Sequence, residues 1–379
     1  MIKILQILND SNIGGAGKLL YNISSCIDRE QYEFVFVFPE NSKLIKRFIP
    51  LGFKIYAIDC VPDTSFDIKS LIKIIKIIKK ERPQIVHTHS SLSGKLALKL
   101  SGCNTIKSIY TKHCVFGVPK IMKIPAIKKL HGSIDDLLSD KIIAVADVAK
   151  HELIESGIKS NKICVIVNGS KPLKQLPEKE KANLRKKLGI KKDEFTVGIS
   201  ARLEWYKGHK YLIKAAKKSV KNHKKIKFLI MGDGSYRKVI EEYSHKLGVD
   251  KNMIFLGFVD DVTSYMNIFD VNVNCSIGTE TSSLSISEGL SLGIPAIVSN
   301  YGGNPNMVIN GKTGYVINKA DPDELYAAIC KLSSNRHLYN SMRCAAIKDF
   351  NSRFSHESMT RKYEIVYKDL IYNNNACRN

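Results

Sequence analysis

The chain has 379 residues, which is more than one hydrophobic core of usual size supports and is typical of two domains. Lys and Arg number 59 against 36 Asp and Glu, giving a net charge of +23, and 44% of the residues are apolar. This composition excludes a disordered or collagen-like chain. The charge has two interpretations: a solvated basic surface, or one that binds acidic partners such as phosphates, anionic membrane or nucleic acid.

The cysteines and the apolar segments indicate where the protein resides. Nine cysteines are dispersed without a CxxC pair, which is typical of reduced thiols in the cytoplasm. Residues 1–8 are too short for the apolar core of a secretory leader, and no stretch approaches the length of a membrane span. We therefore expect a cytoplasmic protein, either soluble or peripheral at the inner face of the cell membrane.

The first half alternates short apolar runs with helical patterns, which predicts a doubly wound parallel sheet. The expected strands are 2–8, 32–38, 54–58, a strand opening at 85–86, 106–110, 142–146 and 163–167. After the first strand comes a glycine turn with Gly14 and Gly15, and a helix is expected to begin near Lys18. Such a turn lets an anion approach backbone N–H groups at a helix N-terminus, although many similar turns only redirect the chain.

Histidines stand at two of these strand ends. His87 and His89 follow one strand, and because no third ligand is suitably spaced we expect hydrogen bonding by these two rather than metal binding. His113 follows the next strand, at the carboxyl end of a parallel sheet where ligands bind.

Residues 119–130 alternate bulky apolar side chains with lysines and contain no acid. This pattern suits an anionic membrane surface, and a solvated loop and helix is the alternative. The lysines concerned are Lys120, Lys123, Lys128 and Lys129.

The second half repeats the organisation of the first. We expect an N-terminal domain over residues 1–170, a linker over 171–192, a C-terminal domain over 193–354, and a final helix at about 355–372 that packs back on the first domain. The second-half strands are expected at 195–199, 227–231, 254–256, 271–274, 296–299 and 315–317. The predicted fold class is α/β, with two Rossmann-like halves and a cleft between them.

Charged residues gather where the second-half strands end. Arg202 and Lys207 follow the first of them, and two fixed cations suit a diphosphate. Glu280 lies in a loop and Glu288 in the helix after it, and carboxylates suit vicinal hydroxyls. A ligand with a diphosphate between two polyols is a nucleotide sugar.

With these residues in place, the sequence resembles the retaining glycosyltransferases of family 4, which have the GT-B architecture of two facing Rossmann-like domains. The resemblance covers essentially the whole chain. It is carried by E-x7-E at Glu280 and Glu288, by R-x4-K-G at Arg202 to Gly208, and by several shorter elements. These are Gly14-Gly15, His87 to Ser90, Asn168-Gly169, Gly293-Ile294-Pro295 and Gly302-Gly303.

The resemblance implies a role for each matching residue. Arg202 and Lys207 would hold the donor diphosphate, Glu280 and His113 would contact the transferred sugar, and Glu288 would bind the ribose hydroxyls. Further donor contacts would come from Gly14, Gly15, Gly232, Gly234, Ser283 and Leu284. No cofactor and no metal are expected, because family members use protein cations in place of Mg²⁺.

The implied reaction is transfer, with retention, of a hexosyl or N-acetylhexosaminyl group from a UDP-sugar to a glycan or lipid-linked acceptor, in surface polysaccharide or glycolipid synthesis. An epimerase or sugar phosphorylase on the same scaffold is the alternative. Nucleic acid is not an expected partner, because the aromatic residues do not interleave with the basic runs. The sugar-facing loop departs from the family's Glu-Gly-Phe-Gly and reads Glu280 to Ser283, ETSS, which leaves the donor sugar open.

Overall fold

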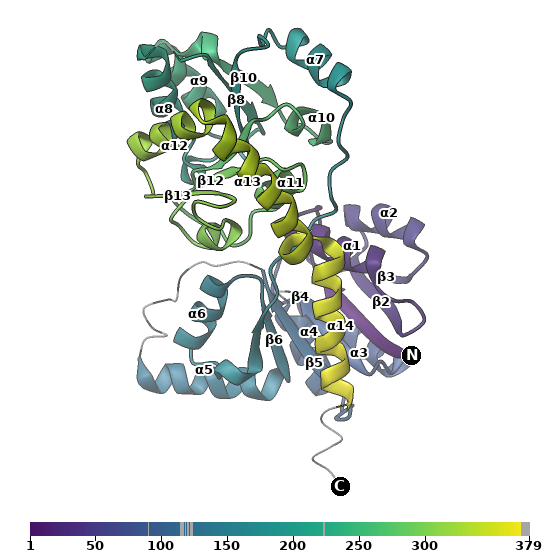
Figure 1. Cartoon of the computed structure of the whole chain (residues 1–379). Coiled ribbons are helices and arrows are strands. Elements are labelled where there is room, and N and C mark those ends of the chain that lie inside the picture. The colour runs from purple at the N-terminus through teal and green to yellow at the C-terminus, as the bar shows by residue number, and fades with distance from the viewer. Residues whose placement is uncertain are drawn as a thin grey trace. The chain divides into compact units, whose positions relative to one another are not determined.

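The computed structural model describes residues 1–89, 91–113, 117, 119, 121, 124–222 and 224–372. These residues form two α/β units, each with its own sheet (Figure 1). The first unit comprises Met1–Gly169 and the C-terminal segment from His356, and the second comprises Ser170–Ser355. Residues 171–192, expected as a linker, belong to the second unit, where the backbone N–H of Leu173 donates to Ser291 Oγ at 3.0 Å.

The first unit is built on a seven-stranded, fully parallel sheet with the order β3-β2-β1-β4-β5-β6-β7. Continuous apolar runs form these strands because helices cover both faces of the sheet. The strands are β1 (Ile2–Leu8), β2 (Tyr32–Pro39), β3 (Lys54–Ile58), β4 (Ile85–His89), β5 (Lys107–Lys112), β6 (Lys141–Ala144) and β7 (Ile163–Val165). The helices are α1 (Gly15–Cys26), α2 (Lys43–Phe48), α3 (Ile68–Glu81), α4 (Leu92–Leu100), α5 (Pro125–Leu138), α6 (Asp147–Glu155) and α14 (His356–Tyr372).

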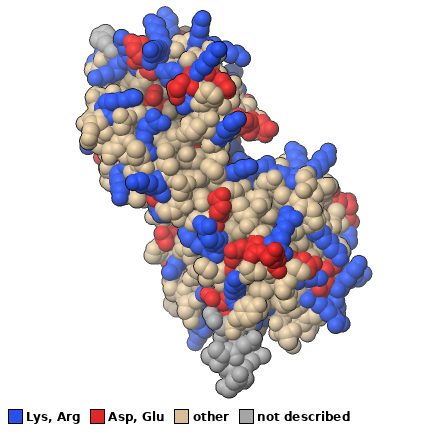
Figure 2. All heavy atoms as spheres, turned by 45° about the vertical axis from the view of Figure 1, so that its right-hand side comes forward, with Lys and Arg blue, Asp and Glu red and all other residues tan. Residues whose placement is uncertain are grey.

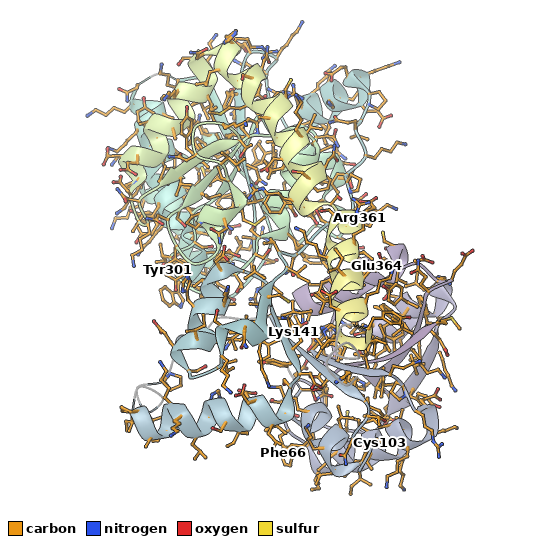
Figure 3. All side chains as sticks on the ribbon, turned by 60° about the horizontal axis from the view of Figure 1, so that its bottom comes forward. Phe66, Cys103, Lys141, Tyr301, Arg361 and Glu364 are labelled. Carbon is orange, nitrogen blue, oxygen red and sulfur yellow. The ribbon has the colours of Figure 1, made fainter. Side chains whose placement is uncertain are left out.

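Helix α14, the last helix of the chain, packs on the first sheet beside α1. Met359, Tyr363 and Tyr367 are buried in the core cluster that contains residues of β1, β2 and β4. Glu364, labelled in Figure 3, fixes the helix to the turn before β2: its carboxylate accepts from the backbone N–H of Asp28 at 3.1 Å. Helices α3 and α4 bury their apolar residues in a separate cluster, with other residues of the same strands.

The second unit has a six-stranded parallel sheet with the order β10-β9-β8-β11-β12-β13. Its strands are β8 (Phe195–Ser200), β9 (Ile226–Met231), β10 (Met253–Gly257), β11 (Val271–Asn274), β12 (Ala296–Ser299) and β13 (Gly314–Ile317). Its α-helices are α7 (Glu178–Lys187), α8 (His209–Lys221), α9 (Arg237–Lys246), α10 (Thr263–Met266), α11 (Leu284–Ser291), α12 (Pro322–Ser334) and α13 (Arg336–Asp349). Helices α8, α12 and α13 contribute to one core cluster, and Met266, Leu292 and Ile294 to another.

Both sheets reverse their strand order at one position. In the first unit the order turns between β1 and β4, and in the second between β8 and β11. Loops that leave two such strands diverge to opposite sides, and they leave a crevice at the carboxyl ends where ligands of open parallel sheets bind. The fold therefore directs attention to the loops after β1, β4, β8 and β11.

The fold confirms the predicted α/β class, and the strand predictions differ from the structure by only a few residues. The expected helix start near Lys18 is wrong by three residues: α1 begins at Gly15, and Gly14 is its N-cap with extended backbone. Glycines disfavour helix interiors in isolated peptides, but Leu19, Leu20 and Ile23 bury one face of α1 and outweigh that preference.

The described residues contain no helix long and apolar enough to cross a bilayer. Lys and Arg side chains are spread over the face of both units seen in Figure 2, with Asp and Glu among them.

Candidate functional site

The loops after β8 and β11 hydrogen-bond to each other at the reversal point of the second sheet. The backbone N–H groups of Ile277 and Gly278 both donate to the carbonyl of Tyr206, at 2.7 and 3.2 Å. Gly208 closes the first loop with φ +74°, and a Cβ there would lie 1.9 Å from the carbonyl oxygen of Cys275. Only glycine permits this approach, so the two loops form one surface.

Lys207 and Glu280 meet on this surface. Lys207 Nζ lies 2.8 Å from Glu280 Oε2, and the two side chains are only 14% and 8% exposed. Asn274, the last residue of β11, donates from Nδ2 to the same oxygen at 2.9 Å, and Ser276 Oγ lies 3.0 Å from it. No hydrogen bond to Glu280 Oε1 occurs within the described residues, so that oxygen remains available as an acceptor.

The backbone around Glu280 is tightly constrained. Its carbonyl accepts from the N–H of Gly303 at 3.1 Å, and a Cβ on Gly302 would approach that carbonyl to 2.1 Å. Thr279, just before it, has a φ of +32°, which is unusual for a β-branched residue. Such strain is retained where the surrounding structure fixes a functional side chain.

Helix α11 begins directly after this loop. Ser283 is its N-cap, with Oγ accepting from the N–H of Ile286 at 3.4 Å, and Leu284 is its first residue. The first N–H groups of a helix lack intrahelical partners and carry partial positive charge, so this terminus suits an anion. Glu288 lies one turn into α11 and is partly exposed.

Arg202 follows β8 and is exposed. No ion pair of its guanidinium occurs in the part of the chain that the structure describes. Gly232 and Gly234 follow β9, the other neighbour of β8, and lie against the same loop. A Cβ would lie 2.0 Å from the carbonyl of Ala201 at Gly232 and 2.5 Å from that of Leu203 at Gly234. The structure thus brings these glycines to the loop that carries Arg202 and Lys207.

Sequence reasoning missed Asn274 and His209. Asn274 is the last residue of β11, and its position at a strand end was the available signal. His209 opens α8 two residues after Lys207, and neither of its ring nitrogens has a hydrogen-bond partner among the described residues. Burial, with the nearby Lys207 charge, lowers the pKa of His209 to about 4, so the ring is neutral at pH 7.

In the first unit, the Gly14-Gly15 turn opens α1 at the reversal point of that sheet. A Cβ on Gly15 would meet no atom within 4 Å, so this turn faces open space. Asp10 precedes it, and burial together with the charge of Asp63 raises the pKa of Asp10 to about 6. The sequence pattern did not point to this carboxyl group.

His113 follows β5 and stacks on His89, with 5.2 Å between the ring centroids. His113 Nε2 lies 3.0 Å from His89 Nδ1. His87 and His89 are fully buried and hydrogen-bonded to protein groups. Ser90, which completes the expected HTHS element, lies outside the described residues.

One set of described side chains could hold a metal ion: Cys26, His356 and Glu357 in the first unit. Its buried member, His356, contacts Glu357 Oε2 through Nδ1 at 2.8 Å. None of these residues belongs to the strand-end loops.

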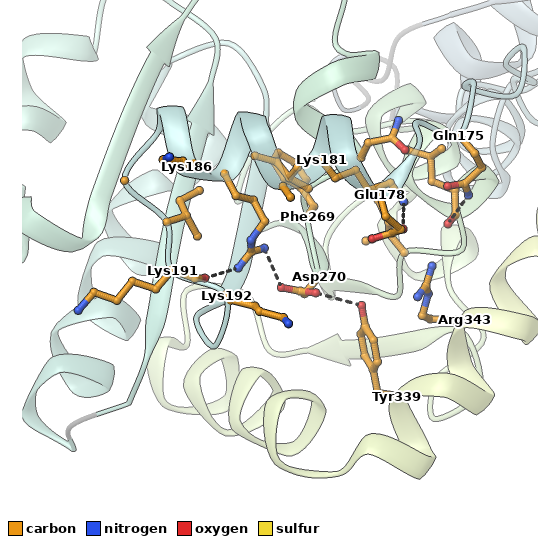
Figure 4. Close-up of a pocket in the computed structure, with 18 of the residues that line it drawn as sticks. Gln175, Glu178, Lys181, Lys186, Lys191, Lys192, Phe269, Asp270, Tyr339 and Arg343 are labelled. Atoms are coloured by element: carbon orange, nitrogen blue, oxygen red, sulfur yellow. Dashed lines mark hydrogen bonds and ion pairs between the residues drawn. The ribbon is translucent and has the colours of Figure 1, made fainter.

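A cavity of about 840 Å³ lies beneath α7 in the second unit (Figure 4). It is lined by residues that precede β8, β11 and β12, at the amino edge of the sheet, away from the loops described above. Arg185 crosses it, with hydrogen bonds to the carbonyls of Lys191 and Glu194 at 3.0 and 2.5 Å and an ion-pair distance of 3.8 Å to Asp270. Because ligands of parallel sheets bind at the carboxyl edge, we assign the site to the loops and not to this cavity.

Comparison with known proteins gives two matching families in consecutive parts of the chain. The family described as Glycosyltransferase Family 4 matches residues 13–171, and the one described as Glycosyl transferases group 1 matches residues 180–349. Together they contain Gly14, Gly15 and His113, and then the cationic and acidic residues of the second unit.

Similar proteins cover most of this chain. The UDP-Gal:alpha-D-GlcNAc-diphosphoundecaprenol alpha-1,3-galactosyltransferase of Escherichia coli is 30% identical over 316 residues, covering 81% of each chain. The capsular polysaccharide biosynthesis glycosyltransferase CapM of Staphylococcus aureus is 26% identical over 318 residues, 80% of this chain and 82% of CapM. The crystal structure of a glycosyltransferase from Rickettsia africae has a TM-score of 0.85 at 24% identity, covering 98% of this chain and 99% of the other, and so shares the fold.

Proposed function

The chain belongs to the family 4 glycosyltransferases with the GT-B fold, and from that premise we propose that it transfers a sugar from a UDP-sugar to a glycan or lipid-linked acceptor in surface polysaccharide or glycolipid synthesis. The E. coli relative is named for a UDP-sugar donor and a lipid diphosphate acceptor, and CapM for capsular polysaccharide synthesis. These two relatives are named as transferases, so the epimerase or phosphorylase alternative is not favoured.

The pairing of Lys207 with Glu280 at the sheet reversal is the observation that carries the proposal. An ammonium group has three N–H donors, and Glu280 takes one, so the others are available to phosphate oxygens. The carboxylate holds Lys207 in place before the donor arrives. We assign to Lys207 and the exposed Arg202 the stabilisation of the charge that develops on the leaving diphosphate.

Glu280 has a second role in this proposal. Its Oε2 is engaged by Lys207, Asn274 and Ser276, which leaves Oε1 to accept a hydrogen bond from a hydroxyl of the donor sugar. Because the loop around it is rigid, the carboxylate meets the sugar in a fixed position, and fixed dipoles need no reorganisation during reaction. We infer that transfer retains the configuration of the donor sugar.

The remaining residues bind the rest of the donor. The N-terminus of α11, at Ser283 and Leu284, supplies backbone N–H groups to phosphate. Glu288 accepts from the ribose hydroxyls, and Gly232 and Gly234 keep the loop floor free of side chains near the base. In the first unit, the open turn at Gly14 and Gly15 lets a ligand approach the backbone at the start of α1, and His113 contacts the transferred sugar.

We infer that no metal is needed, because Arg202, Lys207 and a helix N-terminus supply positive charge that Mg²⁺ provides elsewhere. Glu280 is engaged by one of these cations, Lys207.

We also propose that α5 binds an anionic membrane surface. Leu130, Ile134 and Leu137 form an exposed apolar stripe at helical spacing, 48–66% exposed, and Lys128 and Lys129 lie on the same helix. Apolar residues beside lysines favour insertion at the headgroup level of anionic bilayers. Lys120 and Lys123 lie outside the described residues. Location at the inner face of the cell membrane is consistent with the dispersed cysteines, none of which is joined by a disulfide in the described part of the chain.

Two assays test these proposals. Purified protein is screened with UDP- and GDP-sugars and lipid diphosphate acceptors, and NMR of the product reports the anomeric configuration. Transfer that needs an acceptor and retains configuration is expected; free epimer or sugar phosphate without an acceptor would refute the function. For the membrane, Leu130→Asp should reduce flotation with vesicles containing anionic lipid, with the exposed Val239→Asp of the second unit as control. Equal flotation of Leu130→Asp and the unmodified protein would exclude α5.

A further inference from the structure

A chain of polar side chains crosses the otherwise apolar face of the first sheet under α14. It consists of Gln6 on β1, His87 and His89 on β4, Thr111 on β5, and Tyr367 on α14, each at most 1% exposed. In the sheet register Gln6 is opposite His87, and His89 is opposite Thr111. This hydrogen-bonded path of side chains ends at His113, which the proposed function places against substrate.

All three histidines on this face are neutral. Burial lowers the pKa of His87 to about 3 and that of His113 to about 4, and burial together with the neighbouring rings places the pKa of His89 well below its usual value. A neutral imidazole has one N–H and one bare nitrogen. A hydrogen bond that fixes one nitrogen therefore fixes the other.

The direction of the bonds can be followed from Gln6. Its carbonyl Oε1 lies 2.9 Å from His89 Nε2, and since this oxygen can only accept, His89 Nε2 carries the proton. His89 Nδ1 is therefore bare and accepts from His113 Nε2 at 3.0 Å. His113 then carries its proton on Nε2 and has a bare Nδ1.

The hydrogen bonds that start from the amide nitrogen of Gln6 agree with this orientation of its side chain. Its Nε2 donates to the Tyr367 hydroxyl at 3.1 Å, and that hydroxyl donates to His87 Nδ1 at 2.9 Å. His87 Nε2–H then donates to Thr111 Oγ1 at 2.7 Å. Every atom along this path has a partner of the right kind.

The opposite orientation of the Gln6 amide reverses every bond. It would place a proton on His113 Nδ1, a buried atom that has no hydrogen-bond partner among the described residues. A buried N–H without an acceptor is rarer and more costly than a buried acceptor with a lone pair to spare. The first orientation is therefore the more stable one.

We propose that Tyr367, Gln6 and His89 are positioning residues that hold His113 in the tautomer with a bare Nδ1, so that this nitrogen accepts a hydrogen bond from a substrate hydroxyl. The role of His113 rests on the proposed transfer function, whereas the tautomer itself does not. Tyr367 comes from the last helix of the chain, about 250 residues away in sequence, which makes α14 part of the support of a substrate-contacting residue.

Imidazole ¹⁵N NMR tests the tautomer directly in the whole protein without substrate. With histidines selectively labelled, long-range ¹H–¹⁵N spectra distinguish the bare from the protonated nitrogen of each ring, and the signal lost in His113→Gln identifies His113 among the ten histidines. The expected result is a proton on Nε2 and a bare Nδ1. A proton on His113 Nδ1 would overturn the proposal, whether or not the protein has transferase activity.

The Tyr367→Phe variant tests whether the Tyr367 hydroxyl fixes the orientation of the Gln6 amide and, through it, the tautomer of His113. Without the hydroxyl, the Gln6 amide is free to turn, so the His113 spectrum should show a mixture of tautomers, and kcat/KM for sugar transfer should fall about three- to tenfold, the value of one hydrogen bond. Tyr32→Phe is the matched control, because Tyr32 is buried in the same core cluster and its hydroxyl donates to the backbone carbonyl of Glu364, outside this path of bonds.

The outcomes separate the two proposals. An unchanged His113 spectrum in Tyr367→Phe would refute the role of Tyr367, as would an equal loss of activity in both tyrosine variants. The expected tautomer in a protein that transfers no sugar would contradict the proposed function and leave the tautomer assignment standing. If Tyr367→Phe does not fold, the spectrum of the unmodified protein still decides the assignment.

Discussion

Replacing Glu280 with Ala should weaken both the stability and the activity of the second unit. The carboxylate accepts hydrogen bonds at one oxygen from Lys207 at 2.8 Å and Asn274 at 2.9 Å. Its removal leaves the Lys207 ammonium, on a side chain only 14% exposed, without its carboxylate, and leaves an amide donor without its acceptor. Breaking a buried ion pair in this way costs about 3–5 kcal/mol. Losing the carboxylate that holds Lys207 in place against the leaving diphosphate should cost about 10²–10³ in kcat.

The free energy of unfolding of Glu280→Ala is measured by urea denaturation, monitored by circular dichroism. The matched control is Asp193→Ala, which breaks the Lys225–Asp193 pair of the same unit. Those side chains are 71% and 55% exposed, so the control should change the unfolding free energy by about 1 kcal/mol or less.

A double-mutant cycle that combines Glu280→Ala with Lys207→Met measures the coupling free energy between the two residues. Because Lys207 and Glu280 are each other's partners, the double variant should lose less stability than the sum of the two single variants, by about 0.5–3 kcal/mol. Additive losses would refute the coupling. Full transferase activity of Glu280→Ala would refute the assignment of the site to these loops.

Three further predictions follow from the same structure. Gly208→Ala forces a Cβ to 1.9 Å from the carbonyl oxygen of Cys275, so it should separate the two loops and weaken UDP binding. UDP binding is measured by the fluorescence of the single tryptophan, Trp205, which lies three residues before Gly208. Unchanged UDP affinity would contradict the packing argument. Transferase activity should survive EDTA, and a loss restored by Mg²⁺ would show that the protein cations are insufficient. The lowered pKa values of His87 and His113 mean that the unfolded chain binds protons that the native state excludes between about pH 6.5 and 4. Stability should therefore fall as the pH drops through this range, by up to about 1.4 kcal/mol per pH unit for each histidine, and a urea series that shows no such slope would contradict their burial.

Much of the fold could be predicted because its strands are buried on both faces. Runs such as residues 34–38 and 227–231 contain mostly large apolar residues, and their period and length leave few alternatives to a parallel strand. Helix starts were harder to place. The start of α1 at Gly15 depends on packing of Leu19 and Ile23 on the sheet, which local propensity does not include.

The candidate site was partly predictable for a topological reason. Residues that follow parallel strands lie at one edge of a sheet, so Arg202, Lys207 and Glu280 were expected near one another. Asn274 was not expected in the site, because nothing in the sequence shows that its amide donates to Glu280 Oε2.

The sequence by itself determined the two sheets, the succession of strands and helices along the chain, and the set of residues at strand ends, because apolar runs and helical periodicity are local properties of the chain. Only the tertiary structure decided which polar atoms meet. The Lys207–Glu280 pair joins residues 73 apart, and the bond between Gln6 and Tyr367 joins residues 361 apart. Hydrogen-bond direction depends on distances and on the absence of competing water, and no pattern of neighbouring residues encodes either of them.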